Sequence, residues 1–201
     1  MTTNMRLLLI LTATLGTSCT YGLDGDLATL RAEIVDTEKK IPAEAPLWIF
    51  EGPDRFDQFL DDSSAGVPEF LYLHLAKKMH ALPSREPDAL SQGEWDRAGC
   101  EEDPSKFRGR FWRVRGLIAE LHAEPIKDPK SPFYLVHAGV FFDPDRRPVL
   151  FHVVQKPDVL TLREDTVETS AVFVKWVRYV SRSGKEVRAP LFVGKALRRY
   201  L

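Results

Sequence analysis

Residues 107–121 read FRGRFWRVRGLIAEL, and the alternation within this stretch indicates the fold class of the chain. Apolar side chains fall on one side of an extended backbone and basic ones on the other: Trp112, Val114, Gly116 and Ile118 against Arg113 and Arg115. A period of two is typical of a half-buried β-strand. A glycine in mid-strand suits a place where a strand coils sharply. The sequence therefore predicts a long, bent strand.

Four more strands are expected downstream, at residues 133–142, 149–154, 167–180 and 187–197. The segment between the first two of these, DPDRRP, has the composition of a hairpin turn. Residues 155–166 are compatible with one or two helical turns. Pro190 indicates an edge position or a bulge in the last strand.

Upstream of residue 104 the apolar spacing is helical. The clearest helix is predicted over residues 67–82, where Leu71, Leu75 and Met79 recur every four residues and form a stripe to be buried. Residues 84–104 are polar and predict a loop with a short helical stretch. The fold class is therefore α+β, with a helical segment followed by five strands.

Charge divides the chain at the same place. Residues 1–103 carry nine basic and 19 acidic side chains, a net charge of −10, whereas residues 104–201 carry 19 basic and 10 acidic side chains, a net of +9. The whole chain is 44% hydrophobic and 28% charged, which excludes collagen-like, coiled-coil and wholly disordered proteins. Its two cysteines, Cys19 and Cys100, are too few for a disulfide framework or a four-cysteine zinc site.

The order of three strands, a short helical connection and two strands resembles the OB-fold, a five-stranded Greek-key barrel. The stretches FRGRFWRVRGLIAEL and VFVKWVRYVSRSGKEVRAPLFVGKAL also resemble uncharacterised exported bacterial proteins with such a barrel after a helical segment. The resemblance covers residues 104–201 and implies a fold without an activity. A different small barrel or a β-sandwich remains the alternative.

The N-terminus has the layout of a secretory signal. Arg6 is followed by an apolar block, residues 7–15, and by the small residues Gly16, Thr17 and Ser18. Residues 15–19, LGTSC, resemble the lipobox of bacterial lipoproteins, which implies lipidation of Cys19 and membrane attachment. The alternative is an unmodified Cys19 within a discarded signal. We therefore expect a signal at 1–19, an acidic, mainly helical segment at 20–103, and a basic barrel at 104–201, in an exported, periplasmic or membrane-anchored protein.

The two long strands carry the candidate binding residues. Basic and aromatic side chains alternate there: Arg113, Arg115, Lys175 and Arg178 with Trp112 and Trp176. OB barrels bind single-stranded nucleic acid with such a combination, but a cationic face also attracts an anionic glycan, an acidic lipid surface or an acidic protein. An extracytoplasmic address favours these partners over nucleic acid. Alternatively, the acidic segment of the chain lies against the basic one.

Catalytic motifs are missing from the sequence, so an enzyme is not the favoured class, and no cofactor is expected. An envelope hydrolase without a visible motif stays an alternative. Cys100 stands beside Glu101 and Glu102, which should raise the pKa of its thiol and make it a poor nucleophile. A symmetric hairpin would place His137 opposite His152, and such a pair is more often a buried structural contact than a metal site.

Overall fold

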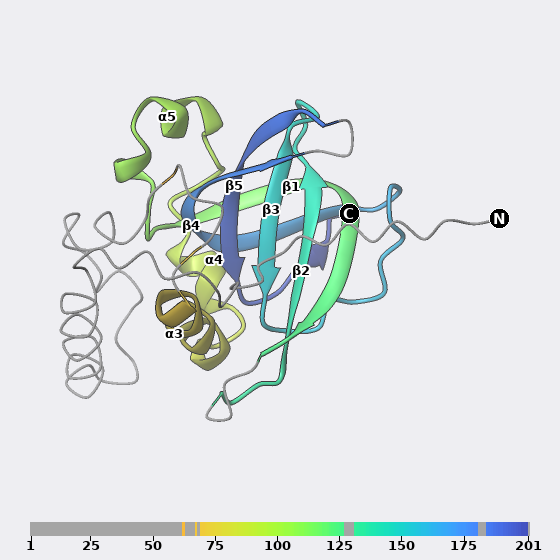
Figure 1. Cartoon of the computed structure of the whole chain (residues 1–201). Coiled ribbons are helices and arrows are strands. Elements are labelled where there is room, and N and C mark those ends of the chain that lie inside the picture. Colours follow the sequence, from red (N-terminus) through yellow and green to blue (C-terminus); the bar gives the residue numbers. More distant parts are fainter. Residues whose placement is uncertain (1–61, 63–66, 68, 127–130, 181–183, 201) are drawn as a thin grey trace, which may run out of the picture. The chain divides into compact units, whose positions relative to one another are not determined.

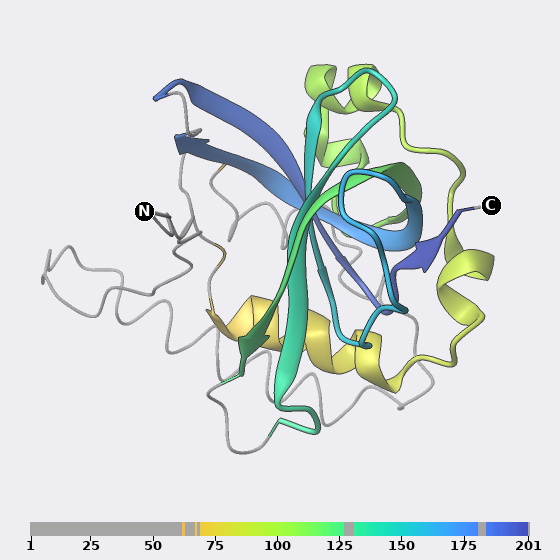
Figure 2. The same ribbon diagram turned by 90° about the vertical axis from the view of Figure 1, so that its right-hand side faces the viewer.

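The computed structural model describes residues 62, 67, 69–126, 131–180 and 184–200, which form an α+β structure. Its helices come first along the chain and its strands second (Figures 1 and 2). The helical elements are α3 (Glu69–Ala81), α4 (Glu86–Leu90), α5 (Arg97–Glu102) and the short 3-10 helix η2 (Pro104–Lys106). The strands are β1 (Phe111–Pro125), β2 (Leu135–Phe142), β3 (Pro148–Val153), β4 (Thr166–Val180), β5 (Glu186–Gly194) and β6 (Arg198–Arg199).

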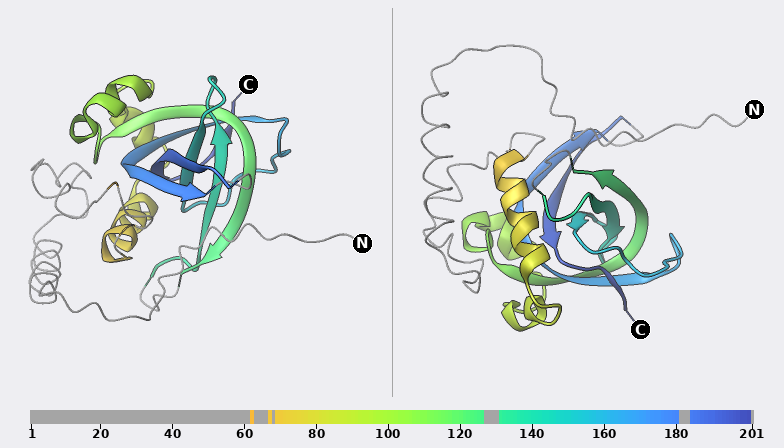
Figure 3. Two further views of the ribbon diagram at one scale, coloured as in Figure 1. Left: turned by 45° about the horizontal axis from the view of Figure 1, so that its top comes forward. Right: turned by 90° about the horizontal axis from the view of Figure 1, so that it is seen from below.

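The six strands form one sheet in the order β1-β2-β3-β5-β4-β6. An additional pairing of β1 with β4 joins five of these strands into a ring, seen nearly end-on in Figure 3. All neighbours are antiparallel except β3 and β5. β4 returns to lie beside β1 after three consecutive strands, which is the Greek-key arrangement.

The predicted helix and the five predicted strands are present, with shifted ends. The first strand begins at Phe111 and continues to Pro125, past the predicted end at residue 121. The helical turns considered for 155–166 do not form. Arg163 adopts a left-handed φ of 66°, and the Asp165 carboxylate accepts a hydrogen bond from the Thr161 amide at 2.7 Å, so this segment is a turn. β6 was not predicted.

Two glycines allow β1 and β2 to approach each other closely. A Cβ on Gly116 would lie 2.1 Å from the Phe142 carbonyl oxygen, and one on Gly139 would lie 2.1 Å from the carbonyl oxygen of Glu120. The sequence predicted that Gly116 serves the coiling of the first strand. In the structure, the specific reason for glycine is that a neighbouring strand's backbone occupies the place of the side chain.

The ring separates two hydrophobic clusters. One contains Val114 and Ile118 from β1 together with Phe141, Phe151 and other side chains from the remaining strands of the ring. The other joins the opposite side of these strands to α3, which lies outside the ring in Figure 3. The predicted stripe of α3 is confirmed, because Leu71, Leu75 and Met79 are buried in this second cluster.

A buried lysine fixes the end of α3. The Lys195 ammonium, 5% exposed, donates hydrogen bonds to the carbonyl oxygens of Met79 at 3.4 Å and His80 at 2.9 Å, and to that of Leu82. The last carbonyls of a helix have no partners within it, so a cation placed there satisfies them and complements the helix dipole.

The N-terminal predictions lie outside the described residues. They are the signal at 1–19, the lipidation of Cys19 and the first part of the acidic segment. In the part of the chain that is described, no helix is long and apolar enough to span a bilayer.

Candidate functional site

The predicted binding residues do not share one surface. Arg113 and Arg115 lie on the accessible side of β1, and Trp112 is half-buried. Lys175 is 0% and Trp176 1% exposed, so the expectation that these two side chains face a partner is not met in the structure. The reason is that both sides of β4 are covered, one by the interior of the ring and the other by the cluster containing α3.

Arg178 lies at the opposite end of β4 from the arginines of β1. Arg113 pairs with Ser170, and Arg178 stands eight residues further along the strand, which corresponds to about 26 Å. Its guanidinium forms an exposed ion pair with Glu186 of β5 at 3.2 Å. The structure therefore brings together only Arg113 and Arg115 of the predicted set, because Trp112 points to the other side of β1 and packs against the cluster that contains Val114 and Ile118.

Arg115 belongs to an accessible group of side chains that we name the Arg115 patch: Arg115, Leu117, Phe142 and Tyr200. The Arg115 guanidinium donates to the Tyr200 hydroxyl at 3.0 Å and lies 5.3 Å from the centroid of its ring. Leu117 follows two residues along β1 and is paired with Phe142 of β2, so both point to the same side of the sheet. Leu117, Phe142 and Tyr200 are 40%, 38% and 45% exposed.

Carboxylates neutralise the neighbouring arginines. Arg113 pairs with Glu94 at 3.4 Å, and Arg198 of β6 forms two bonds to Asp88 of α4 at 2.7 and 2.8 Å. Partial burial acts to raise the pKa of Asp88, but hydrogen bonds from Ser170 and Arg198 hold it below its ordinary value. Among the described residues, no carboxylate lies within ion-pair distance of Arg115, so its charge, unlike those of Arg113 and Arg198, is not neutralised by an ion pair there.

A second arginine-rich site surrounds the buried ring of Trp176. The guanidinium carbons of Arg97 and Arg188 lie 5.3 and 4.7 Å from the ring centroid. The Trp176 backbone amide donates to the Asp62 carboxylate at 3.0 Å, and Arg108 bonds both oxygens of that carboxylate. We name Arg108, Arg188 and the Trp176 amide the Asp62 site.

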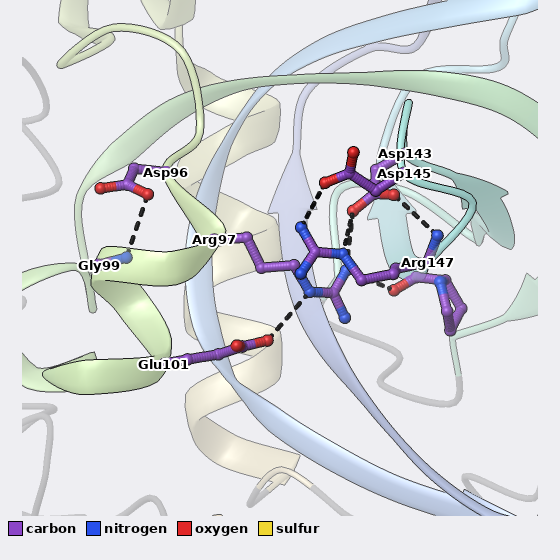
Figure 4. A network of polar contacts seen from close by, with 8 residues as sticks. Asp96, Arg97, Gly99, Glu101, Asp143, Asp145 and Arg147 are labelled. Carbon is purple, nitrogen blue, oxygen red and sulfur yellow. Dashed lines mark hydrogen bonds and ion pairs between the residues drawn. The ribbon is translucent and has the colours of Figure 1, made fainter.

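Arg97 joins α5 to the β2–β3 hairpin (Figure 4). Asp96 caps α5 by accepting a hydrogen bond from the Gly99 amide at 3.0 Å, and Arg97 is the first residue of this helix. The Arg97 guanidinium contacts Asp143 at 3.0 Å and Glu101 at 3.2 Å, and it is 6% exposed. These ion pairs neutralise the buried Arg97 and connect α5 to the hairpin, so Arg97 does not offer a charge to a partner.

The expected pairing of His137 with His152 is wrong. His137 pairs with Val153 and His152 with Ala138, so the two imidazoles point to opposite sides of the sheet. His152 instead shares a hydrogen bond of 2.7 Å with the Tyr72 hydroxyl of α3. Burial lowers the pKa of His152 to about 4, which keeps the ring neutral at pH 7. The described residues contain no cluster of three side chains suited to a metal ion.

Cys100 is completely buried in the hydrophobic cluster that also contains Val114 and Ile118. Burial raises the pKa of its thiol to about 12. The sequence predicted a raised pKa from the neighbouring acidic side chains, and the structure gives a raised pKa through loss of solvent contact. A thiol in this state is a poor nucleophile.

No protein-family model matches the sequence, and searches of curated proteins and of solved structures gave no significant match.

The sequence interpretation missed the residues that complete both sites. Tyr200 stands in the short strand that was not predicted, and Phe142 was regarded only as the end of a strand. Asp62 was one of many acidic residues in its segment. The Leu117–Phe142 pair could have been found from alternation along β1 and the correct hairpin register, whereas nothing in the sequence pattern distinguishes Asp62.

Proposed function

We propose that the ring of five strands is a barrel of the OB type and that the chain is an exported, non-enzymatic binding module of the cell envelope. The Greek-key order, the closing β1–β4 pair and the glycines at the crowded β1–β2 contact support the barrel. The basic, apolar and small residues at the N-terminus support export, with attachment to the membrane through Cys19.

The partner we propose is an acidic protein that binds the Arg115 patch. The carrying observation is that Arg115 has its guanidinium held by Tyr200 and lies beside accessible apolar side chains. Arginine and aromatic residues are enriched at the centres of protein–protein interfaces. A nucleic acid or a glycan polyanion would instead favour a row of cations open to solvent, whereas Arg113, Arg178 and Arg198 all pair with carboxylates here.

The test compares binding of wild-type protein, Arg115→Glu, Leu117→Ser and Arg178→Glu to proteins from an envelope extract and to three defined probes. These probes are polyglutamate, heparin and a single-stranded oligonucleotide. We expect Arg115→Glu and Leu117→Ser to lose the same protein partner, with a loss for Arg115→Glu that shrinks as salt rises. Arg178→Glu, a matched charge reversal about 33 Å further along β4 from the residue paired with Arg115, should bind as wild type does.

Two results would overturn this proposal. One is a protein partner whose binding is unchanged in both patch variants. The other is that the wild-type protein binds heparin or the oligonucleotide more tightly than any protein partner, and that this binding is abolished in Arg115→Glu and unchanged in Leu117→Ser. That outcome would indicate a polyanion as the partner. The mass of the mature protein tests the address separately, since acylated, cleaved and intact N-termini differ in mass.

A further inference from the structure

The Asp62 site lies beside an irregularity in β4. Phe173 pairs with Phe192 and Lys175 with Leu191, so β4 has one extra residue, Val174, between these pairs. Such a bulge disturbs the hydrogen-bond ladder locally. Arg108 donates to the Val174 carbonyl oxygen at 3.3 Å, so this side chain is fixed at the bulge.

Donors from separate parts of the chain converge on the Asp62 carboxylate. Its Oδ1 accepts from Arg108 Nη1 at 3.1 Å and from the Trp176 amide at 3.0 Å. Its Oδ2 accepts from Arg108 Nη2 at 2.6 Å and lies 3.7 Å from Arg188 Nη2. A guanidinium that bonds both oxygens matches the planar geometry of a carboxylate and strengthens the contact.

Contacts that do not involve Asp62 also hold the two arginines of the site. The Arg108 side chain is 9% exposed and lies 5.9 Å from the Phe173 ring centroid, and Arg188 lies over the ring of Trp176. A buried guanidinium is stabilised by an anion, and Asp62 supplies a carboxylate to Arg108 here. Asp62 itself is 23% exposed and reaches the site from a point 46 residues before Arg108.

We propose that Arg108, Arg188 and the Trp176 amide form a carboxylate-binding site for an acidic protein segment, and that Asp62 is its tethered occupant. A segment supplied by a partner protein displaces Asp62 by making the same bonds. The site shares no residue with the Arg115 patch, so this proposal can be tested independently of the function proposed above.

The experiment uses a peptide with the sequence of residues 56–66, FDQFLDDSSAG, titrated into the full-length protein by calorimetry. In the wild-type protein the tethered Asp62 competes at an effective concentration in the millimolar range. Asp62→Asn removes the charge of the competitor and keeps its size. We expect the peptide to bind Asp62→Asn at least about tenfold more tightly than wild type, because a larger fraction of the sites is open.

Matched controls test whether the tighter peptide binding arises at the Asp62 site. The same peptide with asparagine in place of Asp62 retains the adjacent Asp61, and we expect it to bind Asp62→Asn at least about tenfold more weakly than the parent peptide. Adding Arg188→Gln to Asp62→Asn should weaken binding of the parent peptide, whereas adding the charge-neutralising Lys156→Gln, at an exposed residue outside the site, should not.

Equal affinity of the parent peptide for wild type and Asp62→Asn would overturn the proposal, as would equal affinity of Asp62→Asn for the two peptides. If circular dichroism shows that Asp62→Asn is unfolded, the test compares the affinity of the parent peptide for wild type and for Arg188→Gln. Arg188 is 42% exposed and its loss should leave the fold intact. The wild type must then bind the parent peptide about threefold more tightly than Arg188→Gln, and equal affinity contradicts the proposal.

Discussion

Gly139 illustrates how the lack of one side chain allows two strands to approach each other closely. The position of its missing Cβ lies 2.1 Å from the carbonyl oxygen of Glu120, which is backbone and cannot rotate away. We expect Gly139→Ala to lower the free energy of unfolding by about 3 kcal/mol, because overpacking forces the strands apart. Urea unfolding followed by tryptophan fluorescence measures this loss.

Gly194 provides the comparison for Gly139. Its nearest neighbours, Thr169 Oγ1 at 2.9 Å and the Ala171 Cβ at 3.0 Å, lie farther away than the Glu120 carbonyl oxygen lies from the Cβ position of Gly139. Gly194→Ala should therefore cost about 1 kcal/mol, at the lower end of overpacking effects. If both alanine variants were equally stable, crowding between the backbones of β1 and β2 would not be the reason for glycine at residue 139.

Lys195 gives a second prediction at this scale. Burial lowers the pKa of its ammonium, and its hydrogen bonds to the last carbonyls of α3 offset that cost. Lys195→Met keeps the length of the side chain and removes the donor, so we expect a loss of about 2 kcal/mol in thermal or urea unfolding. The exposed Lys156→Met should change stability by at most about 0.5 kcal/mol. Equal effects would mean that the helix end does not depend on the lysine.

Side-chain exposure could be predicted on β1 but not on β4. One side of β1 faces solvent, so its alternation identifies Arg113 and Arg115 correctly. β4 is buried from Val167 to Val177 apart from Glu168, and its residues 171–177, AVFVKWV, are apolar except for Lys175. Such a run is typical of a strand covered on both sides, and a basic residue within it is then buried.

Among the elements, α3 is joined to the ring by a titratable contact. The unfolded chain binds a proton on His152 near pH 6.5, whereas burial lowers the pKa in the folded state to about 4. The unfolded state therefore takes up the proton first, and stability falls as the pH falls through this window. Glu124 opposes this shift and His122 adds to it, while the contact partner is Tyr72.

We expect His152 to contribute a loss of about 2 kcal/mol between pH 7 and pH 5. Urea unfolding at both pH values measures this loss as a difference between variants. His152→Gln should remove this part of the pH dependence, and His80→Gln, an exchange at an exposed residue of the same helix, should retain it. Identical pH dependence in wild type and His152→Gln would contradict the assignment to this contact.

The anchor between α5 and the β2–β3 hairpin gives another prediction about elements. Arg97→Met would remove the closer of the two guanidinium groups that pair with Asp143, which is 9% exposed, and leave it that of Arg147 at 3.5 Å. We expect a loss of about 3 kcal/mol in urea unfolding, the lower end for a broken buried pair. Arg113→Met breaks an exposed pair with Glu94 and should cost at most about 1 kcal/mol. A cost for Arg97→Met as small as that for Arg113→Met would show that the pair does not anchor α5.

The hairpin register shows why element positions were predicted better than their pairing. The strands β2 and β3 were located from their composition, but the connection runs from Asp143 to Arg147, with Arg146 in a left-handed conformation at φ 61°. Phe142 then pairs with Pro148, one residue from the symmetric arrangement assumed from the sequence. A shift of one residue moves every side chain to the other side of the sheet, which is why the histidine pair was wrong.

On the scale of the whole molecule, ion pairs connect the acidic and basic halves of the chain. Asp62 contacts Arg108 and Arg188, Asp88 contacts Arg198, and Glu94 contacts Arg113. The sequence offered this internal arrangement as an alternative to an external anionic partner. The described contacts favour it for these arginines, whereas Arg115 has no such carboxylate among the described residues. The charge division itself could be predicted, but which arginines are neutralised depends on how α4 and the preceding chain meet the ring.

The division of the chain at residue 104 leads to the last prediction. Both hydrophobic clusters include residues that precede it: Leu71, Leu75 and Met79 of α3 in one, and Cys100 of α5 in the other. A fragment of residues 104–201 would expose the side of the strands that α3 covers, and large-to-small losses at single sites of this kind already cost about 2–5 kcal/mol. Typical domains have only about 5–15 kcal/mol of stability in total. We therefore expect residues 104–201 alone to lack a cooperative thermal transition and residues 62–201 to retain one, as measured by near-ultraviolet circular dichroism. A cooperative transition in the shorter fragment, with native near-ultraviolet signal, would establish the strands as an independent domain.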